Sequence, residues 1–112
     1  MHDANVKGCN CQLCGPMSGF PRAQVERAFA DAERRLHRVG AETVWNPVER
    51  IPASTPHEAA MAKCVRVLVN GAVDALVVLP GWEDSQGALL EVSVAHAVGV
   101  RVVDLGEVPS HE

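Results

Sequence analysis

The chain has 112 residues, of which 47% are hydrophobic, and its formal net charge is −4. This length fits one domain with a single core, and no apolar run is long enough to cross a membrane as a helix. The sequence has no basic block and no alternation of basic and aromatic residues, which argues against a nucleic-acid polymer and favours a small molecule or another protein as partner.

The first predicted element is a short buried strand that ends at Cys14. Cys9, Cys11, Cys14 and Cys64 would together make a zinc donor set. In a strand, however, Cys9 and Cys11 point to one face and Cys14 to the other, so we expect no metal, and nothing implies an organic cofactor. The cysteines are not spaced as a disulfide scaffold and no signal peptide is evident, which indicates a cytoplasmic protein.

A glycine-rich turn and a long helix follow this strand. The turn spans Gly15 to Gly19, and the helix begins at Arg22 and ends before Gly40. One apolar stripe recurs at helical spacing and is expected to pack on a sheet. Its members are Val25, Ala28, Phe29, Ala32, Leu36 and Val39.

A second strand, a loop and a second helix are predicted next. The strand covers Glu42 to Trp45, and the loop from Asn46 to Thr55 is long enough to border a site. Thr55-Pro56-His57-Glu58 has the pattern of a capping box with proline at the first helical position, and the helix runs toward Val69.

The apolar run Ala75 to Leu79 is typical of a strand buried on both faces. It is followed by a helix, Gln86 to Val98, and by a last strand, Val100 to Val103. Strands that alternate with helices predict a parallel sheet covered on both sides, a three-layer α/β sandwich of the Rossmann-like or flavodoxin-like kind. We expect a single domain over residues 1–112, with flexible ends at 1–8 and 106–112.

Glu91 is the most informative residue, because it lies on the side of the last predicted helix that should face the core. At about 100° per residue, one narrow arc is apolar apart from this carboxylate, with Leu89 and His96 on the opposite side. The arc consists of Gly87, Ala88, Glu91, Val94, Ala95 and Val98. A buried carboxylate costs several kcal/mol unless partners or a ligand compensate it. Glu91 is therefore either a functional group or one that is paired internally with an arginine such as Arg22 or Arg101.

Ligands of open parallel sheets bind beyond the carboxyl ends of the strands. The loops Gly15–Gly19 and Gly81–Gly87 follow the first and the central strand, so each can offer backbone N–H groups and a hydroxyl, Ser18 or Ser85, to an anion. The alternative is that these glycines only form tight turns. Ser85 and Glu91 are separated by about one and a half helical turns, which places both on the wall of one pocket.

Two segments carry a resemblance to a known family. Leu13-Cys14-Gly15-Pro16-Met17-Ser18-Gly19 and the segment from Leu79 to Glu91, with its Leu-Pro-Gly-Trp and Ser-x-Gly-x-x-x-Glu patterns, resemble a small phage and bacterial family of uncharacterised proteins. That family is related to nucleoside 2-deoxyribosyltransferases and to nucleoside 5'-monophosphate N-glycosidases. The resemblance covers about Cys11 to Val103.

The resemblance implies a nucleoside or nucleotide substrate, with Glu91 as the catalytic nucleophile. It also implies that two loops bind the sugar and its 5' end, through Gly15, Pro16, Met17, Ser18, Gly19, Trp82, Ser85 and Gly87. Relatives form homodimers or larger homo-oligomers, so the same is expected here, with the outer surfaces of the last two helices as the interface or as ordinary sheet coverage.

The chain departs from the characterised relatives at two positions. Gln12 stands where they have a tyrosine, and Cys64 stands at or near their second acidic residue. Asn46 and His57 are candidates for the missing polar contacts, or are a helix cap and a solvated loop residue. Three functions therefore stay open: an N-glycosidase or deoxyribosyltransferase, a non-catalytic binder of nucleotides or ADP-ribose-like ligands, and an assembly protein without a ligand.

Overall fold

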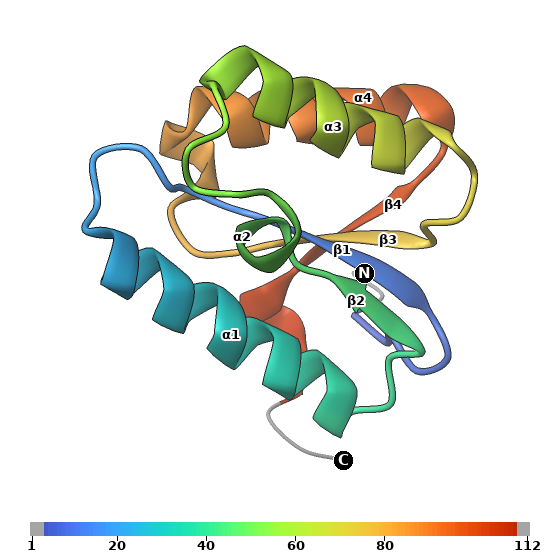
Figure 1. The fold of residues 1–112 in the computed structure, drawn as a ribbon. Coiled ribbons are helices and arrows are strands. Elements are labelled where there is room, and N and C mark those ends of the chain that lie inside the picture. The colour runs from blue at the N-terminus through green and yellow to red at the C-terminus, as the bar shows by residue number, and fades with distance from the viewer. Residues whose placement is uncertain (1–3, 110–112) are drawn as a thin grey trace.

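The computed structural model describes residues 4–109, which form a four-stranded parallel sheet between two layers of helices (Figure 1). The strand order is β2-β1-β3-β4. The strands are β1 (Asn10–Cys14), β2 (Thr43–Trp45), β3 (Ala75–Val78) and β4 (Arg101–Asp104). The long helices are α1 (Arg22–Arg38), α3 (His57–Val69) and α4 (Gln86–Val98). Helix α1 covers one face of the sheet, and α3 and α4 lie side by side on the other. The predicted three-layer α/β sandwich is confirmed.

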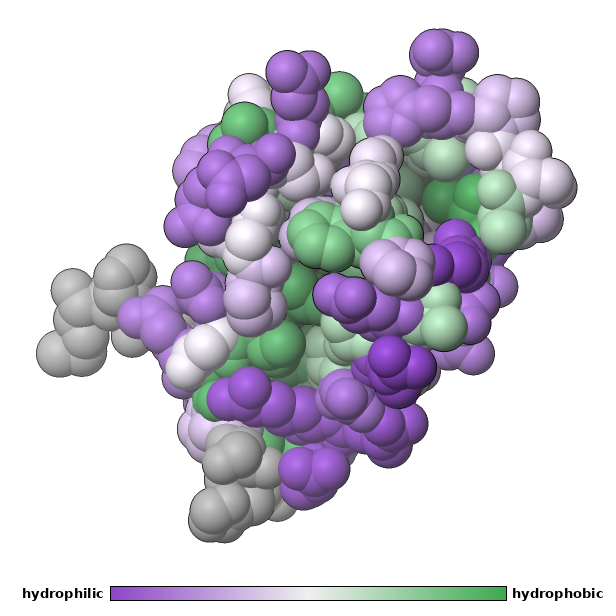
Figure 2. Space-filling model, turned by 90° about the vertical axis from the view of Figure 1, so that its left-hand side faces the viewer, coloured by the Kyte–Doolittle hydropathy of each residue, from purple (hydrophilic) through white to green (hydrophobic). Residues whose placement is uncertain are grey.

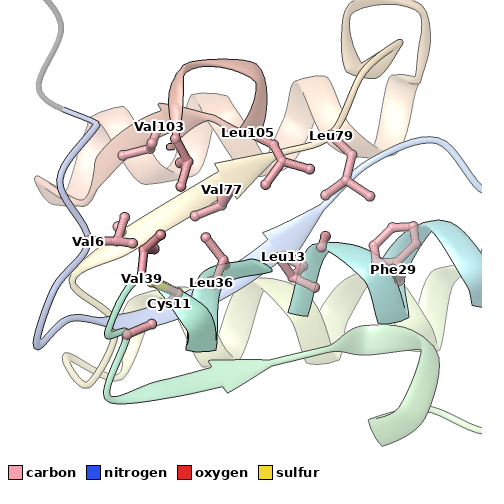
Figure 3. Packing of buried hydrophobic residues seen from close by; sticks show 14 of the residues in the cluster. Val6, Cys11, Leu13, Phe29, Leu36, Val39, Val77, Leu79, Val103 and Leu105 are labelled. Atoms are coloured by element: carbon pink, nitrogen blue, oxygen red, sulfur yellow. The ribbon is translucent and has the colours of Figure 1, made fainter. Parts of the chain in front are cut away.

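The two faces of the sheet bury two separate hydrophobic clusters. Cys11 and Leu13 of β1 pack in the cluster that includes the apolar stripe of α1 (Figure 3). Cys14 packs in the cluster beneath α4, together with Leu76 and Val78 of β3. Cys11 and Cys14 are therefore on opposite faces, as the alternation of a strand predicts.

The helical stripes are confirmed with one exception in each helix. In α1, Val25, Phe29, Ala32 and Leu36 are buried, whereas Ala28 is exposed. In α4, Ala88, Glu91 and Ala95 of the predicted arc are buried, whereas Val98 is 47% exposed. Val92, which was not assigned to the arc, is buried as well. Val98 is the last residue of α4. The Glu91 side of α4 was predicted correctly.

The predicted loop from Asn46 to Thr55 contains a short helix, α2 (Pro47–Arg50). Asn46 caps it, because its Oδ1 accepts a hydrogen bond of 3.0 Å from the Val48 N–H, and Pro47 occupies the first helical position. The capping box expected at Thr55 is absent, since α3 begins at His57 after Pro56 and has no side-chain cap.

The expectation of flexible ends at 1–8 and 106–112 falls partly on residues 1–3 and 110–112, which lie outside the described residues; the described end segments each place one side chain in the core. Val6 and Val108 are buried in the α1 cluster. A 3-10 turn, η2 (Leu105–Glu107), leads to Val108, whose carbonyl accepts a hydrogen bond from the Arg35 guanidinium. These contacts join segments that are distant in sequence, so local composition did not reveal them.

The direction of the chain across the sheet reverses between β1 and β3. From β1 the chain crosses by α1 to β2 on one side, and then by α3 to β3 on the other side of β1. In open parallel sheets, such a switch point opens a crevice beyond the carboxyl ends of the two strands. Among residues 4–109, no helix is long and apolar enough to cross a membrane.

Candidate functional site

A cavity of about 740 Å³ lies at this switch point. Its walls come from the loops that follow β1, β2 and β3 and from the helices α3 and α4. Figure 2 shows this end of the molecule, where hydrophilic residues surround hollows with hydrophobic residues inside. The volume is within the range of about 300–1,000 Å³ that is typical of small-molecule sites.

Glu91 contributes a buried carboxyl group to the cavity wall. Glu91 lies on the sheet-facing side of α4, and only 5% of the residue is exposed. Burial raises the pKa of this carboxyl group above its usual value, because leaving water disfavours the charged form. Within the described part of the chain, no ion pair joins Glu91 to a cation.

Neither arginine considered as an internal partner compensates Glu91. Arg22 donates to Glu26 Oε2 at 3.2 Å and to the Val48 carbonyl at 3.1 Å. Arg101 donates to the Asn5 carbonyl at 2.8 Å, at the opposite end of the sheet. The prediction that internal pairing explains Glu91 is therefore wrong, and the carboxyl group is left facing the cavity.

Two buried thiols are the polar neighbours of Glu91. Cys14 reaches it from the end of β1 and Cys64 from the middle of α3, and interaction with both thiols opposes the effect of burial on the pKa of Glu91. Burial raises the pKa of both thiols above the usual range for cysteine, and proximity to Glu91 raises them further. Both cysteines are therefore neutral hydrogen-bond donors rather than nucleophiles near neutral pH.

Gln12 lies behind these groups and not on the cavity wall. It is fully buried, and its Nε2 donates a hydrogen bond of 3.1 Å to the Cys64 carbonyl. Its Oε1 has no partner in the structure. Gln12 thus ties β1 to the α3 residue whose thiol interacts with Glu91.

The N-terminus of α4 forms the cavity wall beside Glu91. Ser85 caps the helix, since its Oγ accepts a hydrogen bond of 3.2 Å from the Ala88 N–H, and it also lines the cavity. Gly87 lines the cavity too, but a Cβ there would lie 3.1 Å from Met61 Sδ of α3. Both residues therefore have a structural role in addition to the position expected of them.

The loop after β1 supplies the facing wall through Gly15, Pro16, Met17 and Ser18. Gly15 is required for packing as well, because a Cβ there would lie 2.9 Å from Leu79 Cβ. Gly19 has a φ of +88°, which suits glycine, and it does not line the cavity.

Of three other predicted site residues, one lines the cavity and two do not. His57 lines the cavity at the start of α3. Asn46 is a buried cap of α2 that also donates to Glu33 Oε1 at 3.1 Å, and it is not on the cavity wall. Trp82 is also outside the wall and packs against the α4 cluster.

Sequence reasoning missed several residues of the wall. Arg22 at the start of α1 and Asp84 of the 3-10 turn η1 (Trp82–Asp84) add a cation and an anion. The α2 segment adds Pro47, Val48 and Ile51. The pair Asn46-Pro47 was a sequence signal for this helix, since asparagine followed by proline is a common helix start.

Comparisons with known proteins give one match. The family described as "Domain of unknown function (DUF4406)" matches residues 10–104, which is most of the chain. The searches of curated proteins and of solved structures found no match. Both segments that carry the cavity loops and Glu91 fall within the matched residues.

Proposed function

We propose that this chain, which belongs to the DUF4406 family, cleaves or transfers the N-glycosidic bond of a deoxynucleoside or its 5'-monophosphate, with Glu91 as the nucleophile. The observation that carries the proposal is the buried Glu91 carboxyl group, which lines a cavity of about 740 Å³ and has no cationic partner among residues 4–109. A carboxylate in such a place is suited to stabilise positive charge that develops on a bound sugar.

The chemistry requires two displacements at the sugar. In the first, a Glu91 oxygen forms an ester bond to C1' while the bond from C1' to the base nitrogen breaks, and the base leaves with the bonding electrons and takes up a proton. In the second, water or another base attacks C1', the ester bond breaks and the carboxylate is regenerated. The configuration at C1' is retained, because each step inverts it once.

The cavity wall offers groups for the rest of a nucleotide. The backbone N–H groups at the start of α4 and the Ser85 hydroxyl are suited to the 5' end of the sugar or its phosphate. Arg22 adds a guanidinium whose remaining N–H groups can bind an anion. His57 and Asp84 also line the wall and are candidates to protonate the leaving base.

Base release from a panel of deoxynucleosides and their 5'-monophosphates tests the proposal. Free base in the chromatogram of the wild type, lost in Glu91→Gln, supports it. Because Glu91 attacks as the carboxylate and its pKa is raised, the rate is expected to rise with pH through that raised pKa. No base release from any member of the panel contradicts the proposal.

A second function is favoured by the surroundings of Glu91. Gln12 stands where the characterised enzymes that the sequence resembles carry a tyrosine, and Cys64 stands at or near their second acidic residue. This replacement removes support for the leaving group and is compatible with a non-catalytic binder of nucleotides or ADP-ribose-like ligands. Calorimetric binding of a nucleotide without base release, weakened in Ser85→Ala, would favour this alternative.

We also infer that the chain forms a homodimer or a larger homo-oligomer through the outer face of α4. Leu89 and Leu90 are each at least 45% exposed on this face, where a monomer would normally carry polar residues. Light scattering after gel filtration measures the mass of the assembly. The substitution Leu90→Lys is expected to lower this mass to that of one chain, and a wild type that is already monomeric contradicts the inference.

We propose the cytoplasm as the location of the protein, because its four cysteines are free.

A further inference from the structure

We propose that Phe20 is a binding residue, whose exposed ring is the platform on which the base of a bound nucleotide stacks. The inference deepens the proposed function and rests on it for the identity of the ligand. It assigns a role to an exposed aromatic side chain and locates the base within the cavity.

Phe20 is an aromatic residue outside the core and on the cavity wall. It lies in the loop between β1 and α1, lines the cavity and is 49% exposed. The other phenylalanine, Phe29, is 1% exposed and packs in the α1 cluster, and neither tryptophan of the chain lines the cavity. Because Phe20 belongs to neither core cluster, its ring has surface available to a ligand.

The backbone on both sides of Phe20 fixes its position. Gly19 has a φ of +88°, a left-handed conformation that glycine adopts readily. No atom lies within 4 Å of a Cβ built at Gly19, so the conformation and not the available space requires glycine. Pro21 restricts the preceding residue, Phe20, to extended conformations, and it also caps α1. The ring is therefore held in place before a ligand arrives, which gives Gly19 a role although it does not line the cavity.

The loop that carries Phe20 is joined to the apolar α2 segment. Arg22, two residues after Phe20, donates a hydrogen bond of 3.1 Å to the Val48 carbonyl of α2. Val48, Ile51 and Pro52 line the same cavity as Phe20. Ile51 is only 8% exposed, yet it packs in neither core cluster. Phe20 and the α2 segment together give the cavity an apolar side, which suits the flat faces of a base.

Glu91 and the start of α4 leave this side of the cavity for the base. The base is attached to C1' of the sugar and the 5' carbon to C4', so the two groups extend from the ring in different directions. Glu91 marks the position of C1' in the proposed reaction, and the N-terminus of α4 with Ser85 is suited to the 5' end. The base then extends toward the wall that Phe20 and α2 form. Since stacking accepts every base, Phe20 contributes affinity for the base more than choice between bases.

The test measures the affinity of two ligands by calorimetry. Deoxyadenosine 5'-monophosphate carries a base, whereas 2-deoxyribose 5-phosphate has the same sugar and phosphate without one. The proteins are Phe20→Ala and Phe20→Tyr, each in the Glu91→Gln background, which keeps the nucleotide intact. The matched control is Val69→Ala, because Val69 is 50% exposed at the end of α3 and does not line the cavity.

Phe20→Ala is expected to bind the nucleotide about 5- to 150-fold more weakly, which is the range that stacking of one base contributes. Its affinity for the sugar phosphate is expected to be unchanged. Phe20→Tyr keeps the ring and retains the affinity, as does Val69→Ala. Nucleotide affinity unchanged in Phe20→Ala, an equal loss for both ligands, or no binding of the nucleotide to the Glu91→Gln protein would each overturn the inference.

A fluorescence measurement separates stacking from simple apolar contact. The fluorescence of 2-aminopurine is quenched when the base stacks, so its deoxyriboside 5'-monophosphate is expected to be quenched on binding to Glu91→Gln and to its Phe20→Tyr variant, but not to its Phe20→Leu variant. Equal quenching in the leucine variant contradicts the inference. If these effects are seen but the wild type releases no base from any substrate, the proposed chemistry fails while the role of Phe20 stands.

Discussion

Replacing Glu91 by glutamine is expected to stabilise the fold while it removes the proposed chemistry. The side chain keeps its shape, but the charge that burial disfavours is gone. Most substitutions of a buried polar residue destabilise a protein. Stabilisation here would therefore be specific evidence that the native carboxylate is retained for function.

The size of the effect follows from the titration of Glu91. The pKa of Glu91 in the folded chain is raised above the usual value of 4.5 that it has in the unfolded chain, so between these two values the folded chain holds a proton that the unfolded chain has released. The free energy of unfolding of the wild type therefore falls as pH rises through this interval, by about 1.4 kcal/mol for each pH unit of the interval. Below the unfolded pKa the contribution is fully present, and above the folded pKa it is lost.

The assay is urea unfolding of the wild type and Glu91→Gln from about pH 4 to about pH 8. The advantage of the variant is expected to grow with pH and then become constant, and each kcal/mol corresponds to about 4–8 °C in Tm for a domain of about this size. An advantage that is the same at both ends of the range, or a variant that is less stable than the wild type at the upper end, would refute the reasoning.

Three further predictions concern the elements that build the cavity. Ser85→Ala is expected to destabilise the fold by about 1 kcal/mol, because the Ala88 N–H loses its cap, and thermal unfolding measures this. Gly15→Ala is expected to cost about 1–3 kcal/mol, since its Cβ would meet Leu79 at 2.9 Å, whereas Gly87→Ala should be within about 1 kcal/mol of the wild type, because Met61 is flexible and alanine favours the helix. Equal losses for the two glycine variants in urea unfolding would contradict this comparison. Asn46→Ala is expected to cost about 1–2 kcal/mol through loss of the α2 cap and of the bond to Glu33, with base release retained; a selective loss of base release at unchanged Tm would instead place Asn46 in the site.

The fold and the position of Glu91 were predictable because local signals were strong. The continuous apolar run from Ala75 gave β3, and a helical period of 100° per residue placed Glu91 on the buried side of α4. Helix α4 was predicted with the correct bounds, since the Ser85 cap and Gly99 mark its two ends. These features depend on residues close together in the sequence.

The surroundings of Glu91 were not predictable from the sequence, because they depend on how the crossovers pack. Cys14 and Cys64 are 50 positions apart by their numbers and meet only when α3 lies against β1 and α4. The same reason explains the missed burial of Val6 and Val108, which pack against α1 from opposite ends of the chain. Helix α2 was missed for a different reason: Asn46-Pro47 was interpreted as the end of a strand and the start of a loop, although it is equally a helix start.

Detection of a covalent intermediate on Glu91 tests the central claim most directly. The protein is incubated with a deoxynucleoside 5'-monophosphate that it cleaves, quenched in acid, digested and examined by mass spectrometry. We predict that the peptide containing Glu91 carries a deoxyribosyl phosphate adduct in the wild type and none in Glu91→Gln. Base release with an unmodified Glu91 peptide, or an adduct on another residue, would contradict the account.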